Sequence, residues 1–203
     1  VLAAVTSMVL PGGPVRTASE RGGAWLIFQA YASPTPARAG EAVRRDLARG
    51  VEGVALVLDR AARLGLRPDD PRASDLVGKH GIGLSSLDDV AAVLAPIDLA
   101  ATPIVLDVGA NGAPAAALVA AHAAARGVPP EKIELLAAID PYGALAADGK
   151  LPRTETALFR EARWLKAAFP RGRARGASGG PVYEAGACYA SKGGAIAATL
   201  AAY

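Results

Sequence analysis

Three aspartates follow apolar runs of the kind that form buried strands. Asp59 ends the run from residue 54, Asp107 lies in the run 103–108, and Asp140 ends the run from residue 133. Ligands bind at the C-terminal ends of strands in open parallel sheets and in (β/α) barrels. If the three carboxylates converge there, they could hold a divalent cation through oxygen ligands. That arrangement would suit a metal-dependent (β/α) barrel lyase or aldolase.

No histidine or glutamate stands at these strand ends to complete a coordination shell. The simpler alternative is that these aspartates cap helices and loops, which is a common role for this residue. The sequence has no GxGxxG fingerprint after its first strand and no P-loop, so neither a dinucleotide site nor a P-loop nucleotide site is supported. The single Cys188 and two distant histidines exclude a Cys/His zinc cluster, and we predict no metal ligand. His122, within an alanine-rich segment, is interpreted as a packing or surface residue.

The elements that must position these groups alternate strictly between strand and helix. Residues 60–83 form a polar excursion that is too long for a routine loop, and we expect it to lie outside the core. The strict alternation of strands and helices predicts a parallel sheet with right-handed crossovers. Five units suit a doubly wound sheet, whereas a closed barrel needs eight and about 250 residues. The predicted strands are 24–31, 51–59, 102–108, 133–140 and 174–182; the predicted helices are 35–49, 87 onward, 113–126, 154–169 and 186–202.

Composition narrows the class of protein. The hydrophobic fraction of 52% suits strands covered on both faces, and no apolar run is long enough to span a membrane. Net charge is only +3 and aromatic residues make up 5%, so a nucleic-acid partner is not expected. One cysteine in 203 residues indicates a reducing compartment, and we predict a cytoplasmic protein. Residues 1–23 are a Gly/Pro-punctuated lead-in, and the initial Val1 suggests a piece of a longer protein.

A series of strings, in order and at matching spacing, resembles the substrate barrel of the methylmalonyl-CoA mutases. These enzymes are adenosylcobalamin-dependent acyl-CoA mutases, and the resemblance covers about residues 9–203. The strings are WLIFQ at 25–29, DLARGVEG at 46–53, DPR at 70–72, GKHGIG at 78–83, SLDD at 86–89, ANGAP at 110–114, IDPYGAL at 139–145 and EAGA at 184–187.

The resemblance implies a barrel with coenzyme A along its axis. Residues 24–203 would then form an incomplete (β/α) barrel domain, a partial (β/α)8 TIM barrel with about five βα units and parallel strands. Three further strands and a cobalamin-binding domain would be missing. No motif of the cobalamin domain occurs in the sequence, so adenosylcobalamin would belong to the complex and would not be bound by this chain alone.

Departures from the family pattern fall at positions that are catalytic in its active members. Those members carry Arg-Gln where this chain has Phe28-Gln29, and a glutamine where it has Ala138. They carry Tyr-His just ahead of the EAGA string, where this chain has Pro181, Val182 and Tyr183. No catalytic group is therefore predicted at these degenerate positions. The remaining candidates for substrate binding at the strand ends are Gln29, Asp107, Asn111, Asp140 and Tyr183.

The family also contains heterodimers that pair a large catalytic chain with a smaller, degenerate one. The strings at 140–145 and 178–187 resemble the small chain more closely. We therefore predict the small, non-catalytic subunit of a methylmalonyl-CoA mutase-like isomerase, whose larger partner performs the radical rearrangement of methylmalonyl-CoA to succinyl-CoA. Two alternatives remain: a catalytic mutase barrel acting on another acyl-CoA, and the metal-dependent barrel enzyme.

Overall fold

The protein contains one five-stranded parallel sheet, described by a computed structural model that covers residues 26–178, 180–186, 188 and 196. The strands lie side by side in the order of the sequence. Val54 of β2 pairs with Ile104 of β3, and Ile104 pairs with Leu135 of β4. Their bounds are β1 Phe28–Tyr31, β2 Gly53–Val57, β3 Ile104–Asp107, β4 Leu135–Ile139 and β5 Arg173–Arg175.

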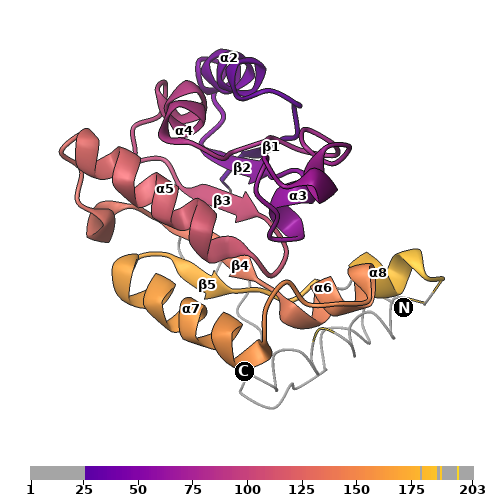
Figure 1. Ribbon diagram of the computed structural model, residues 1–203. Helices are drawn as coiled ribbons and strands as arrows, with labels where there is room; N and C mark the ends of the chain where they lie inside the picture. Colours follow the sequence, from indigo (N-terminus) through magenta and orange to yellow (C-terminus); the bar gives the residue numbers. More distant parts are fainter. Residues whose placement is uncertain (1–25, 179, 187, 189–195, 197–203) are drawn as a thin grey trace, which may run out of the picture.

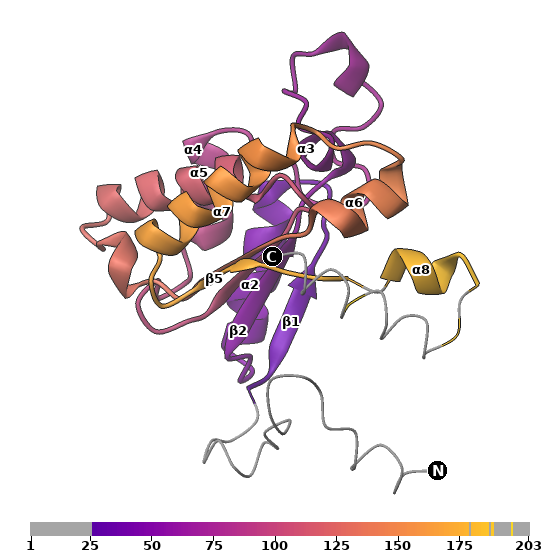
Figure 2. The ribbon, with the colours of Figure 1, turned by 90° about the horizontal axis from the view of Figure 1, so that it is seen from below.

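Four helices form one layer against the sheet, in the order α2, α4, α5 and α7 (Figure 1). Shorter helices α3, α6 and α8 lie toward the C-terminal ends of the strands, and Figure 2 shows β1 and β2 pointing toward α3 and α6. The helix bounds are α2 Pro36–Leu47, α3 Arg60–Arg63, α4 Leu87–Leu94, α5 Gly112–Ala125, α6 Pro141–Asp148, α7 Glu155–Ala168 and α8 Gly180–Glu184, with 3-10 turns η2 Pro71–Ala73 and η3 Pro130–Lys132.

The sequential strand order decides between the two architectures left open by the sequence. A doubly wound sheet reverses its strand order at a switch point and carries helices on both faces. Here the order never reverses, and the four layer helices contact one another in sequence. The predicted partial (β/α) barrel with five parallel βα units is therefore confirmed, and the sheet is not closed.

Side chains alternate between the two faces of the sheet because the period of a strand is two residues. On the helix-facing side, Val54, Leu56 and Leu58 of the second unit are fully buried, as are Ile104 and Leu106 of the third. The opposite side, called the inner face here, carries residues of intermediate or high exposure. Asp107 at the end of β3 is the acidic side chain on this face. The other inner-face side chains from β1 to β4 are apolar, and they are Phe28, Ala30, Ala55, Val57, Val105, Leu136 and Ala138.

Local sequence signals explain where several helices begin. Ser86 and Asp89 form the predicted capping box, with Asp89 N–H donating to Ser86 Oγ at 3.1 Å and Ser86 N–H donating to Asp89 Oδ2 at 2.9 Å. Thr154 caps α7 through Ala157 N–H at 3.4 Å. Thr35 occupies the N-cap position of α2, but its side chain makes no capping bond. Pro36 at the first helical position fixes the backbone there.

Two sequence-based predictions are wrong in part. The fifth strand, predicted for 174–182, contains only Arg173–Arg175, and residues 180–184 form α8 instead. The excursion 60–83 is not outside the core, because it contains α3 and returns to the sheet at Ile82, which is fully buried and bridges Leu58. The lead-in 1–23 and most of the last predicted helix, 186–202, fall outside the described residues.

Across the described residues, the structure contains no helix with the length and apolar character needed to cross a membrane.

His122 provides a test of its own packing on α5, where the side chain is partly buried. Burial and the neighbouring Arg126 lower the pKa of this imidazole below its ordinary value of 6.5. The folded state therefore binds this proton less readily than the unfolded state. The stability that the neutral imidazole contributes is present above pH 6.5 and is lost as pH falls through the folded pKa. We expect an NMR titration of His122 to give a midpoint below 6.5 and a His122→Gln variant to show a weaker loss of stability on acidification. A midpoint at or above the ordinary value would contradict this packing.

Candidate functional site

A pocket of about 430 Å³ lies where β3, β4 and β5 end, and we call it the rim pocket. Its position is the one at which barrel proteins bind ligands. It brings together four positions singled out from the sequence, Asp107, Ala138, Asp140 and Pro181. The other lining residues come from α3, α6, α8 and the loops beside them; they are Arg60, Arg63, Gly109, Gly143, Ala144, Ala147, Asp148, Gly176, Ala177, Ser178, Gly180 and Glu184.

Asp140 lies in the wall of the rim pocket, but its carboxylate is committed to the backbone. It accepts from Gly143 N–H at 2.8 Å, which caps α6, and from Ser178 N–H at 2.6 Å. The second bond ties the segment after β5 to the end of β4. With 7% of its surface exposed, Asp140 is a structural acid in this conformation.

Asp59 follows the same pattern at the end of β2 and does not line the rim pocket. Its carboxylate accepts from Ala62 N–H and from Gly78 N–H, both at 2.8 Å. The first bond caps α3, and the second holds the loop that returns over β2. The capping interpretation therefore describes both Asp59 and Asp140. Among the described residues, no cluster of three or more His, Cys, Asp or Glu side chains is placed to hold a metal ion.

Two ion pairs cross the rim pocket. Arg63 Nη2 lies 2.8 Å from Asp107 Oδ1, and Arg60 Nη2 lies 2.6 Å from Asp148 Oδ1. Arg63 also donates to the carbonyl of Leu58 at 3.3 Å, which fixes the guanidinium beside the strand end. Asp107 keeps 53% of its side chain exposed, so it is the strand-end acid most open to solvent. With Asp140 and Glu184 the pocket holds more carboxylates than cations, an environment that disfavours an anionic ligand.

Asn111 lies away from the rim pocket, although only four residues separate it from Asp107. Its amide Nδ2 donates to Ala62 O at 2.8 Å, and its Oδ1 accepts from Arg153. Arg153 also donates to Glu161 at 2.8 Å. Burial raises the pKa of Glu161, while Arg153 and Arg160 act in the opposite direction. Asn111 thus links α3 and α5 to Arg153 and does not line the rim pocket.

The candidates on β1 and α8 are also separate from the rim pocket. Gln29 is exposed and donates from Nε2 to the carbonyl of Ala30 at 3.0 Å. Phe28 lies on the inner face, where a Cβ placed on Gly53 would be 2.4 Å from the ring. The aromatic ring therefore covers Gly53, and a larger residue at this position would displace the ring. Tyr183 is half-exposed on α8, two residues after the Pro181 that lines the rim pocket.

Three further charged residues line the rim pocket and were not among the predicted site residues, namely Arg60, Asp148 and Glu184. One signal for Arg60 was available, because it directly follows a strand-end aspartate and so has to lie at the rim. Asp148 had no such signal, since it reaches the pocket only through the length and direction of α6.

The strand order and the rim pocket define a barrel-type α/β protein with its candidate site at the C-terminal ends of the strands. Comparison with known proteins then identifies the family. A family model described as methylmalonyl-CoA mutase matches residues 14–203, and the chain belongs to the methylmalonyl-CoA mutase family.

Individual relatives differ in how much of the chain they match. The methylmalonyl-CoA mutase small subunit of Streptomyces virginiae is 30% identical over 181 residues, which is 89% of this chain. The large subunit of the same organism is 29% identical over 109 residues, or 54% of this chain. The methylmalonyl-CoA mutase of Escherichia coli K12 is 28% identical over the same share. The chain spans 26% of the length of the small subunit and 15% of each of the other two.

Proposed function

We propose that this chain is part of the small, non-catalytic subunit of a methylmalonyl-CoA mutase-like isomerase. In this proposal a larger partner chain rearranges (R)-methylmalonyl-CoA to succinyl-CoA. The similarity to the S. virginiae small subunit carries the proposal, because it extends over 89% of the chain while that to the large subunit of the same organism stops at 54%.

The degenerate positions support a non-catalytic role. Where the family resemblance implies an arginine, Phe28 presents an aromatic ring to the inner face. Ala138 brings only a methyl group to the rim pocket, where a glutamine is expected of catalytic members. Pro181 has no N–H to donate, and Val182 follows it where Tyr-His is expected. Loss of one hydrogen-bond donor from a thioester carbonyl site removes about 3 kcal/mol of stabilisation.

The polar groups that remain at the rim point to the same role. Asp140 accepts two backbone N–H groups, Asp107 pairs with Arg63, and Asn111 is held between Ala62 and Arg153. Catalytic groups act by contact with the reacting atoms, at hydrogen-bonding distance. Asp140 and Asn111 would first have to give up bonds that hold the local structure together, and Asp107 would have to leave its ion pair with Arg63.

The described residues do not fit adenosylcobalamin. A histidine could supply an imidazole to cobalt, but His122 lies in the helical layer on α5 and His80 lies in the exposed loop after α3. Neither lines the rim pocket. In this proposal the cofactor is held by other parts of the complex, and this chain contributes its barrel surface.

Co-expression with a larger, cobalamin-binding mutase chain from the same organism tests the proposal. We expect the two chains to co-purify in equal amounts and the complex to convert methylmalonyl-CoA, while this chain alone shows no turnover. An unrelated (β/α) barrel of similar size serves as the control for non-specific association. Recovery of this chain without the larger chain, or turnover by this chain alone, would overturn it.

A further inference from the structure

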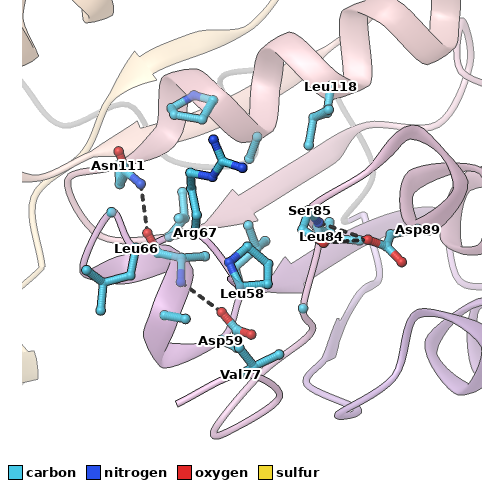
Figure 3. A pocket seen from close by; sticks show the side chains of 18 of the residues that line it. Leu58, Asp59, Leu66, Arg67, Val77, Leu84, Ser85, Asp89, Asn111 and Leu118 are labelled. Atoms are coloured by element: carbon cyan, nitrogen blue, oxygen red, sulfur yellow. Dashed lines mark hydrogen bonds between the residues drawn. The ribbon is translucent and has the colours of Figure 1, made fainter. Parts of the chain in front are cut away.

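A second pocket, of about 460 Å³, lies on the helix side of the sheet and shares no lining residue with the rim pocket (Figure 3). We call it the outer pocket. It lies between α3, the loop that follows α3, and the first turns of α4 and α5. Leu58, Leu84 and Val108 form a buried floor, and the walls come from the more accessible side chains of Leu66, Val77 and Leu118. This volume lies in the range of small-molecule sites, which are mostly apolar with a few polar groups that orient the ligand.

The cationic groups of the outer pocket gather on the side of α5. Figure 3 shows Arg67 reaching toward α5, between Asn111 and Leu118. Arg153 also lines the pocket and is bonded to Asn111. Its Nε–H is buried and has no hydrogen-bond partner, which is a costly state for a charged donor. The N-terminus of α5 also faces this region, and the Asn111 side chain does not cap it. It therefore adds the positive end of a helix dipole.

The two carboxylates of the outer pocket are already satisfied. Asp59 accepts from Ala62 N–H and Gly78 N–H, and Asp89 accepts from Ser85 and Ser86. Burial acts to raise the pKa of Asp89, but these bonds outweigh it and lower the pKa overall. Both carboxylates are therefore occupied as acceptors, and Figure 3 places them away from the Arg67 guanidinium. Charge in the pocket is therefore divided, with the two occupied carboxylates at one end and the guanidinium groups of Arg67 and Arg153 at the other.

We propose that the outer pocket binds an apolar monocarboxylate, of which octanoate is the probe. The hydrocarbon chain would lie on Leu58, Val77 and Leu84, and the carboxylate would lie between Arg67 and Arg153. An acceptor there offers Arg67 a partner besides Asp69, to which Arg67 now donates twice, at 2.9 and 2.8 Å. The inference does not depend on the proposed function, because the site lies outside the inner face and the rim pocket.

Calorimetric titration of the purified full chain with sodium octanoate tests the proposal. We expect one site with a Kd of roughly 0.1–1 mM, the range that fits a ligand of this size. Ala115→Leu adds bulk inside the pocket and is expected to abolish binding. Arg67→Gln, at an exposed position that folding does not require, is expected to weaken binding about threefold to fivefold, as for a solvent-screened ion pair. Arg38→Gln on the exposed side of α2 is the matched control and leaves binding unchanged.

Neutral 1-octanol separates recognition of the carboxylate from burial of the chain. Octanol is expected to bind the unaltered protein more weakly than octanoate does. The affinity of octanol for the Arg67→Gln variant is expected to equal its affinity for the unaltered protein. The circular dichroism spectrum of each variant reports whether it is folded. Absence of octanoate binding, equal binding of octanol, or binding that survives Ala115→Leu in the folded variant would overturn the assignment.

Discussion

Replacing Asp140 with alanine is expected to lower the free energy of unfolding by about 2–3 kcal/mol, through loss of a helix cap and of a second, partly buried hydrogen bond. The carboxylate accepts from Gly143 N–H at 2.8 Å and from Ser178 N–H at 2.6 Å. Both donors lose their partner in the variant. Because Ser178 is exposed, water can replace part of the second bond, which keeps the loss below that of two fully buried groups. Urea unfolding followed by circular dichroism measures the change.

Asp107→Ala is the matched control for this prediction, since it removes a carboxylate from the same rim. Its side chain is 53% exposed and its partner Arg63 can be solvated in the variant. The expected loss is below about 1 kcal/mol, as for other exposed ion pairs. Equal losses for the two variants would show that Asp140 has no greater structural role than an exposed surface acid.

Replacing Gly81 with alanine is expected to cost about 3 kcal/mol, near the upper end of the usual range for overpacking. A Cβ at this position would lie 2.4 Å from the carbonyl carbon and oxygen of Leu58 and 2.6 Å from Val57 O. These atoms belong to the backbone of the sheet and cannot rotate away. The loop would have to lift from the strand end and break the bond from Ile82 N–H to Val57 O, now 2.8 Å.

Gly83→Ala provides the comparison within the same loop. There the nearest atom to an added Cβ is the Asp59 Oδ2 at 3.2 Å, a side-chain oxygen that can shift by a few tenths of an ångström. The expected loss is below about 1 kcal/mol, since a surface-type substitution of this kind is usually mild. Thermal and urea unfolding of both variants give the comparison. Similar stabilities would mean that the loop is not clamped against β2 at Gly81.

The strands could be predicted because their burial leaves a simple apolar pattern, whereas the barrel arrangement was expected only from the family resemblance. Leu56, Leu106 and Ile139 belong to apolar runs whose lengths match single strands, and an aspartate lies at or near the end of each run. The capping box at Ser86 was readable for a similar reason, since its two partners are only three residues apart. Signals that depend on neighbours in the sequence thus carried most of the fold.

The fifth strand could not be bounded from the sequence. Arg173 and Arg175 alternate with Ala174, so the segment offers only one small apolar side chain to the core. The strand exists because Ala174 packs under the helical layer and Gly176 N–H reaches Ile139 O at 3.1 Å. These contacts come from tertiary structure, which overrides a weak local preference.

The roles of the strand-end residues were likewise hidden by distance along the chain. Asp140 bonds to a residue 38 positions away, and Asp59 to one 19 positions away. Asn111 follows Asp107 closely, yet the start of α5 turns its side chain toward Ala62. The positions of these residues near the ends of the strands could therefore be predicted from the topology. The hydrogen bonds that their side chains make could not.

Turnover by the reconstituted complex is the most direct test of the claim that this chain performs no chemistry. The measurement is the rate of methylmalonyl-CoA conversion after Tyr183→Phe and Asp107→Asn are introduced together into this chain. Both side chains are about half exposed, so the complex should assemble as before. We predict a rate within about twofold of that of the unaltered complex, because loss of a group engaged in proton transfer typically costs 100-fold or more. A fall of about that size would contradict the account and assign the chemistry to the rim of this chain.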